Sequence, residues 1–163
     1  MDRGSLGLQQ LGGAVASGSA ALDAVHMAEL ARGVVEQPRG SNDGERIRIY
    51  QKAAGAPAKS AWCASYAFWA HRQAGVDAYR SAWCPDWARH GRAVYSNGVS
   101  RRNPAPGDWI LVWSRKERRY VHITSIHGMS GDYYITIGGN ESDALRMGRM
   151  DMRTVIFVGT YLD

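Results

Sequence analysis

The sequence has few cysteines and no long apolar run. Two cysteines in 163 residues cannot form the disulfide framework that stabilises small secreted domains, and neither cysteine has the spacing of zinc ligands. A single Cys63–Cys84 disulfide is left open by the sequence. No segment approaches the roughly 20 apolar residues that cross a bilayer. The sequence therefore predicts no metal centre and no stable membrane insertion.

The N-terminal stretch lacks the features of a secretory signal. Residues 1–22 are small and weakly apolar, but Asp2 lies where a signal peptide carries positive charge, and Gly and Ser interrupt any apolar core. We interpret residues 1–20 as a flexible segment and residues 21–163 as a single domain, since this length suffices for one hydrophobic core. We expect synthesis in the cytoplasm without a signal peptide.

Positive charge is in excess but is not concentrated on one element. The formal net charge of +5 and the pI near 9.5 favour an anionic partner, such as nucleic acid, an acidic membrane surface or an acidic cell-wall polymer. The densest basic run, residues 115–119, has the position of a hairpin tip. Because the other basic residues are scattered, we do not expect nucleic-acid binding.

Hydrophobic periodicity changes in the middle of the chain. Helical spacing or helix end signals predict helices at residues 20–35, 45–54 and 60–73, with a further helical turn within 81–91. After the Pro- and Gly-rich turn at 103–108, short runs of β-formers predict about five strands. These lie at residues 109–113, 120–127, 133–137, 145–150 and 155–161. The order predicts an α+β domain in which helices pack on one antiparallel sheet.

Cys63 has the position of a nucleophile at the start of a buried helix. Ser60 is a candidate N-cap, which places Cys63 in the first helical turn, where free N–H groups and the helix dipole favour a thiolate. The apolar residues that follow predict burial on most sides. An inert buried cysteine is an equal alternative from this segment alone.

One of five histidines lies in a strand pattern suited to a general base. His122 lies in the run of residues 121–126, in which strand alternation places it on one face with Thr124 and Ile126. A half-buried structural histidine is the alternative. The other four histidines have the positions of surface or structural residues. They are His26, His71, His90 and His127.

Asn140 follows Gly138 and Gly139 at the predicted end of the next strand. An amide there has the position to orient the imidazole of His122, although a simple turn explains the same residues. The order of Cys, His and Asn on a helix and two adjacent strands is that of papain-like enzymes, and this joint pattern outweighs the separate structural alternatives.

Four blocks of the sequence resemble the CHAP-type amidohydrolase/peptidase domains of the NlpC/P60-like papain superfamily, including phage-lysin and antibacterial-effector members. The blocks are residues 36–47, 62–75, 104–123 and 138–144. The chain departs from the family pattern at Val121, where many relatives have Gly, and at Gly138, where many have Glu. The third catalytic role then falls on Asn140, with Glu141 a less favoured substitute and Asp108 or Glu36 as distant candidates.

The resemblance implies a papain-like fold and a peptidoglycan hydrolase that cleaves an amide bond, either as a muramoyl-L-alanine amidase or as a stem-peptide endopeptidase. Cys63 would attack the carbonyl, His122 would move the proton and Asn140 would orient the imidazole, without a cofactor. Four further residues are candidates for substrate binding, with a core or loop position as the alternative for each. They are Asn42, Tyr50, Trp62 and Trp83.

Two other classes of function stay open at the level of sequence. One is a cysteine protease or deamidase toxin that acts on a protein, and the other is a catalytically inactive module that binds the cell wall. For the hydrolase we expect a monomer that acts in the periplasm or on the cell wall. A phage holin or a secretion apparatus would deliver it, and an immunity protein would be a partner.

Overall fold

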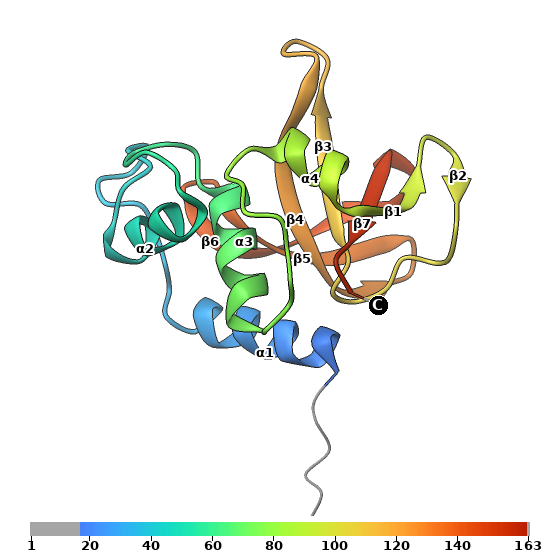
Figure 1. Cartoon of the computed structure of the whole chain (residues 1–163), viewed down its shortest axis with the longest axis horizontal. Helices are drawn as coiled ribbons and strands as arrows, with labels where there is room; N and C mark the ends of the chain where they lie inside the picture. The colour runs from blue at the N-terminus through green and yellow to red at the C-terminus, as the bar shows by residue number, and fades with distance from the viewer. Residues whose placement is uncertain (1–16, 163) are drawn as a thin grey trace, which may run out of the picture.

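The computed structural model describes residues 17–162 and has the predicted α+β architecture (Figure 1). Its helices are α1 (Gly18–Leu30), α2 (Glu45–Ala54), α3 (Cys63–Gln73) and α4 (Cys84–His90). Between residues 17 and 162, no helix has both the length and the hydropathy to cross a membrane.

The strands form one antiparallel sheet that contains seven strands within the described residues, where the sequence predicted about five. Their order is β2-β1-β7-β3-β4-β5-β6. They are β1 (Arg92–Ser96), β2 (Val99–Ser100), β3 (Trp109–Ser114), β4 (Arg119–Ser130), β5 (Tyr133–Glu141), β6 (Ala144–Asp151) and β7 (Phe157–Thr160), with a short 3₁₀ helix at Met152–Thr154.

The prediction missed the short hairpin of β1 and β2, in which β2 is exposed and β1 buries Val94. Its two-residue turn, Asn97-Gly98, has positive φ at both positions, as a tight hairpin turn requires. That dipeptide was the available signal. The two short strands around it have too little hydrophobic alternation to be recognised as strands.

Two predicted boundaries are corrected at the helix starts. Ser17 caps α1 by accepting from the N–H of Ala20, so residues 18–20 belong to the folded domain, while residues 1–16 of the predicted flexible segment lie outside the described residues. Ser60 does not cap α3, because its hydroxyl donates to the carbonyl of Pro57. Helix α3 begins at Cys63 itself, so the predicted place of Cys63 in the first turn is confirmed.

Helix α3 is buried on two sides and is central to the domain (Figure 1). On one side Ala64 and Phe68 pack with Trp109 and Ile123 of the sheet. On the other side Tyr66 and Trp69 pack with α1, α2 and β5 residues. Both sides are buried apolar surfaces. A sliding or tilting motion of α3 would therefore expose apolar area to water, at a free-energy cost of about 25 cal/mol per Å².

The alternation of β3 divides the sheet into two apolar faces. Trp109 and Leu111 join the cluster that contains α3, whereas Ile110 points to the opposite face, where it packs with Val94 and Val158. The strands next to β3 are therefore covered on both faces, which fixes their register beneath α3.

We predict that Gly159→Ala destabilises the fold because a Cβ at residue 159 would lie 2.2 Å from the indole of Trp109. Overpacking of a core typically costs about 1–3 kcal/mol. Gly128→Ala is the matched control, since no atom lies within 4 Å of its added Cβ. Urea unfolding should show a lower midpoint for Gly159→Ala and a midpoint near that of the unchanged protein for Gly128→Ala; equal midpoints would contradict this packing.

Candidate active site

The start of α3 is held in place by hydrogen bonds from buried polar side chains. The indole of Trp62, the residue before Cys63, donates to the Glu36 carboxylate at 2.9 Å. The side-chain amide of Gln51 donates to the carbonyl of Ser60 at 2.9 Å. These bonds fix the loop that enters α3, so the first residue of the helix, Cys63, has a defined position.

The sulfur of Cys63 has a second cysteine and a backbone carbonyl as neighbours, and Cys84 and His122 favour its ionised form. Its Sγ is 3.7 Å from the Sγ of Cys84 and 3.9 Å from the carbonyl oxygen of Val121. The pKa of Cys63 is lowered well below its usual value, first by the hydrogen bond from Cys84 and also by the hydrogen bond and charge of His122, against the opposing effect of burial. The hydrogen bond with Cys63, followed by burial, raises the pKa of Cys84. These opposite shifts assign Cys84 as the donor and Cys63 as the thiolate.

His122 lies on β4 and is bonded to Glu141 on β5. Its Nε2 donates to Oε1 of Glu141 at 3.1 Å, which leaves Nδ1 as the nitrogen available to Cys63. Burial alone would lower the pKa of His122, but hydrogen bonds and charge interactions with Cys63 and Glu141 outweigh burial and raise this pKa to about 9. At neutral pH the site therefore contains a thiolate and an imidazolium beside a carboxylate, the arrangement of an activated cysteine nucleophile.

The expectation that Asn140 orients His122 is corrected by this geometry, because the carboxylate of Glu141 is the partner. Strand β5 contains a bulge: Gly138 pairs with Arg146 and Glu141 pairs with Ala144, so two residues of β5 stand opposite one of β6. Asn140 has φ +56°. The extra residue reverses the strand alternation, and Glu141 therefore points to the side that Asn140 would occupy in a regular strand.

Gly138 leaves the space that the Glu141 carboxylate occupies. A Cβ at residue 138 would lie 2.3 Å from Oε1 of Glu141 and 2.7 Å from the hydroxyl oxygen of Thr124. The family resemblance leads one to expect Glu at residue 138. Gly138 at this position is thus coupled to the bulge. A carboxylate three residues later fills the same volume. No local pattern in the sequence predicts the bulge, because a φ above zero at Asn is common in ordinary turns.

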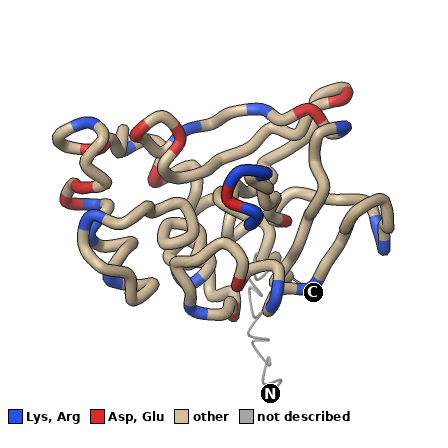
Figure 2. Tube along the Cα trace, turned by 90° about the horizontal axis from the view of Figure 1, so that it is seen from above, with Lys and Arg blue, Asp and Glu red and all other residues tan. Residues whose placement is uncertain are grey.

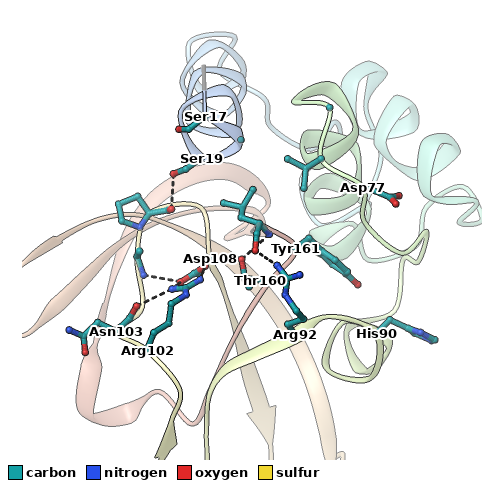
Figure 3. A pocket seen from close by; sticks show the side chains of 16 residues that line it. Ser17, Ser19, Asp77, His90, Arg92, Arg102, Asn103, Asp108, Thr160 and Tyr161 are labelled. Carbon is teal, nitrogen blue, oxygen red and sulfur yellow. Dashed lines mark hydrogen bonds and ion pairs between the residues drawn. The ribbon is translucent and has the colours of Figure 1, made fainter. Parts of the chain in front are cut away.

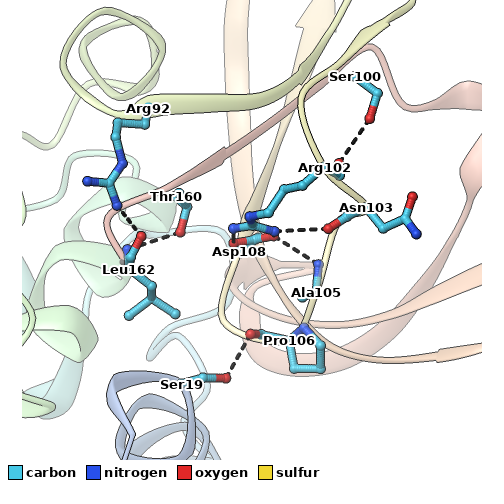
Figure 4. A network of polar contacts seen from close by, with 10 residues as sticks. All are labelled: Ser19, Arg92, Ser100, Arg102, Asn103, Ala105, Pro106, Asp108, Thr160 and Leu162. Atoms are coloured by element: carbon cyan, nitrogen blue, oxygen red, sulfur yellow. Dashed lines mark hydrogen bonds and ion pairs between the residues drawn. The ribbon is translucent and has the colours of Figure 1, made fainter.

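The two distant carboxylates considered from the sequence have structural roles. Glu36 is bonded to Trp62 and to the N–H of Asn42. Asp108 accepts two hydrogen bonds from Arg102, at 2.7 and 2.8 Å, and one from the N–H of Ala105 (Figure 4). Neither carboxylate replaces Glu141 at the imidazole.

A cavity of about 1000 Å³ lies away from Cys63, beyond the C-terminal end of α3 (Figure 3). Gly75 and Val76 line it together with the first residues of α1 and the end of the chain. Several of its polar groups are engaged within the protein: Ser19 donates to the carbonyl of Pro106, and Arg102 pairs with Asp108 (Figure 4). The first bond ties α1 to the 103–108 turn, and the second holds Asp108 of the turn to Arg102.

The other four histidines have partners of their own. His26 contacts the Tyr66 hydroxyl, and His71 contacts the carbonyl of Ala67. Burial lowers the pKa of His26 to about 3 and that of His71 to about 4, so both are neutral core residues. His90 stacks on Tyr79 and His127 contacts Asp23.

The predicted substrate-binding residues have divided outcomes. Tyr50 and Trp62 have no exposed surface and stack on each other in the core, so their prediction as surface groove residues is wrong. Aromatic rings pack well in cores, and the neighbouring sequence does not show whether an aromatic residue is buried or exposed. Asn42 is half-buried in the loop against Glu36, and Trp83 is 48% exposed; for these two residues substrate binding stays a prediction. Among residues 17–162, no cluster of three or more His, Cys, Asp or Glu side chains is placed to hold a metal ion.

We predict that Gly138→Ala lowers the pKa of His122 without unfolding the domain, because the added methyl group displaces the Glu141 carboxylate that stabilises the imidazolium. Gly148→Ala on the neighbouring strand is the matched control, since its Cβ would lie an ordinary 3.5 Å from Oε2 of Glu141. NMR titration of the His122 imidazole measures the effect. The pKa should fall below about 9 in Gly138→Ala only, and an unchanged value would show that Glu141 is not the partner.

Comparison with known families agrees with this geometry. The family model described as CHAP domain matches residues 55–140, which is over half of the chain and includes Cys63 and His122. The match ends one residue before Glu141. No curated protein and no solved structure matches the chain. The chain belongs to the CHAP-domain family.

Proposed function

We propose that this CHAP domain hydrolyses an amide bond of peptidoglycan, either the muramoyl-L-alanine bond or a bond within the stem peptide. Membership of the family supports an amidase- or peptidase-type hydrolase. The observation that carries the proposal is the contact series from Cys63 through His122 to Glu141. A wall-binding module has no need for a thiolate held against an imidazolium.

In this mechanism the thiolate of Cys63 attacks the carbonyl carbon of the amide. The imidazolium of His122 then donates its proton to the leaving nitrogen as the C–N bond breaks, and a thioester remains on Cys63. His122, now neutral, accepts a proton from water, which attacks the thioester and releases the carboxylic acid. Glu141 stabilises the imidazolium in the first step and keeps its ring oriented.

The start of α3 supplies donors for the oxyanion. The first bond of the helix runs from the N–H of Tyr66 to the carbonyl of Trp62, so the N–H of Cys63 lies before the regular helical ladder and next to the attacking sulfur. A backbone N–H at this place can stabilise the negative charge that develops on the carbonyl oxygen.

The charge of the protein supports an anionic polymer as substrate. The chain carries a net charge of +5, and the stem peptides of peptidoglycan carry free carboxylates. Long-range attraction of this kind raises encounter rates at low ionic strength. The proposal does not depend on a metal or an organic cofactor, since each step uses side chains that the site contains.

The substrate class is tested with purified sacculi. We expect the unchanged protein to reduce their turbidity and to release new amino groups or new muramoyl ends without new reducing sugars, while Cys63→Ala stays folded and inactive. Mass spectrometry of the products identifies the bond. New reducing ends would indicate a glycosidase, and turnover of a protein in place of sacculi would favour a protease or deamidase; either result contradicts the proposal.

The role of Glu141 is tested by its pH profile. Glu141→Gln removes the charge that stabilises the imidazolium, so the pKa of His122 must fall, and the high-pH limb of activity near pH 9 should move to lower pH. We expect kcat/KM at neutral pH to fall by about 10²–10⁴-fold. Asn140→Gly is the control, because it removes the amide but accepts the positive φ. A crippled Asn140→Gly protein beside an active Glu141→Gln protein would restore Asn140 as the orienting residue.

A further inference from the structure

A groove of about 360 Å³ lies between α4 and the β3–β4 hairpin. We call it the hairpin groove. The residues that define it are Trp83, Arg89, Trp113, Arg118, Arg119 and Tyr120. In Figure 1 the hairpin of β3 and β4 projects from the sheet beside α4.

Two residues that line the hairpin groove are sequence neighbours of groups that contact the nucleophile. Trp83 precedes Cys84, whose sulfur is 3.7 Å from that of Cys63. On the opposite wall Tyr120 precedes Val121, whose carbonyl oxygen is 3.9 Å from the same sulfur. Two walls of the groove are therefore joined through the backbone to the two groups that contact the Cys63 sulfur.

The walls of the groove combine exposed aromatic surface with positive charge. Trp83 is 48% exposed and Trp113 is 43% exposed, and Trp113 is fixed by an edge-on contact with Tyr120 at 5.1 Å. Large exposed aromatic side chains at a concave surface are typical of binding sites. Cores bury such rings, as this chain does with Trp62, Trp87 and Trp109.

The charge is concentrated at the tip of the hairpin. Residues 115–119 contain four basic side chains and one acidic side chain, which Figure 2 shows as the blue segments around a red one at the hairpin tip. Arg119 pairs with Glu117, and Arg89 pairs with Asp86. Arg118 is exposed and forms no ion pair with any of residues 17–162, so its guanidinium is available to an external anion.

We propose that the hairpin groove binds the acidic stem peptide of peptidoglycan, with a peptide carboxylate on Arg118 and the apolar parts of the peptide on Trp83 and Trp113. This inference rests on the proposed function. Charge complementarity favours the stem peptide over the glycan strand as the ligand. The stem peptide has free carboxylates. The glycan has none at sugars whose lactyl carboxyl group is already linked to a peptide. Guanidinium–carboxylate pairs have the geometry for such recognition.

Binding to Cys63→Ala protein, measured by titration calorimetry, tests this site. The probes are a soluble disaccharide tetrapeptide, the same molecule with amidated carboxyl groups, and a neutral N-acetylglucosamine oligomer. Trp113→Ala and Arg118→Asn should each raise the Kd for the first probe about tenfold, and Asn tolerates the φ of +52° at residue 118. Tyr79→Ala and Arg39→Asn, which change exposed residues outside the groove, should leave the Kd unchanged.

The probes distinguish the possible outcomes. Loss of affinity on amidation supports the stem peptide as occupant. Binding of the neutral oligomer with equal affinity would identify a glycan subsite and overturn the proposal, as would a Kd insensitive to Trp113 and Arg118. Failure of the proposed function would give a different result: the unchanged protein would bind the probe but would not hydrolyse sacculi.

A second and independent observation is the pair of sulfurs at the nucleophile. Cys63 and Cys84 are both free, and their exposed fractions are 5% and 4%. Their sulfurs are 3.7 Å apart, whereas a disulfide bond is about 2.0 Å long, so the two sulfurs must move closer to form one.

We infer that Cys84 is a resolving cysteine that protects the nucleophile from irreversible oxidation by peroxides. The Cys63 thiolate attacks hydrogen peroxide, forming an S–O bond, breaking the O–O bond and releasing hydroxide, so that Cys63 becomes a sulfenic acid. The Cys84 sulfur then attacks Cys63, the S–O bond breaks, and water leaves with the proton of Cys84. The product is an inactive Cys63–Cys84 disulfide, which a dithiol reduces to the active pair.

Treatment with about one equivalent of hydrogen peroxide tests this inference. The unchanged protein should lose both thiols, and its mass should fall by that of two hydrogen atoms. Dithiothreitol should then restore the activity that the protein had before oxidation. Cys84→Ser keeps a donor for the thiolate but has no resolving sulfur, so under excess peroxide it should accumulate sulfinic acid on Cys63 and stay inactive after dithiothreitol. Equal recovery of the two proteins, or two thiols remaining in the oxidised protein, would overturn it.

Discussion

The activation of Cys63 depends on the packing of the first turn of α3 against β4. The helix is buried between two apolar clusters, and hydrogen bonds to Glu36 and from Gln51 hold the residues before it. This rigidity keeps the sulfur beside Cys84 and the backbone of Val121. In a looser arrangement water would solvate the thiolate and the imidazolium separately, and the mutual stabilisation that shifts both pKa values would be lost.

The third member of the site, Glu141, contacts His122 because strand β5 contains a bulge. A bulge at residues 139–140 turns Glu141 toward His122, and the absence of a side chain at Gly138 provides the volume for its carboxylate. The charge matters beyond orientation, since a carboxylate stabilises an imidazolium and an amide does not. Gly138, the bulge and Glu141 therefore act as one unit, in which a change at one position alone removes the contact.

The sequence predicted the parts of the fold that depend on strong periodicity. Helix α2 lies within the predicted bounds, α3 ends at the predicted residue, and β3 to β7 overlap the five predicted strands. The sequence-based prediction failed where contacts between distant parts of the chain determine the position of a residue. Tyr50 and Trp62 are core residues because three helices close over them, and the bulge that selects Glu141 over Asn140 follows from pairing with β6, which no local pattern encodes. Cys84 lies 21 residues from Cys63, and only the approach of α4 to α3 brings the sulfurs together.

The most direct measurement of the central claim is intact-protein mass spectrometry during turnover of a soluble muropeptide, followed by peptide mapping after an acid quench. The account predicts an acyl group in thioester linkage on Cys63, which hydroxylamine removes, and a longer-lived adduct in a Glu141→Gln protein whose imidazole no longer assists water as well. An adduct on Cys84, or continued turnover by Cys63→Ala without any adduct, would contradict it.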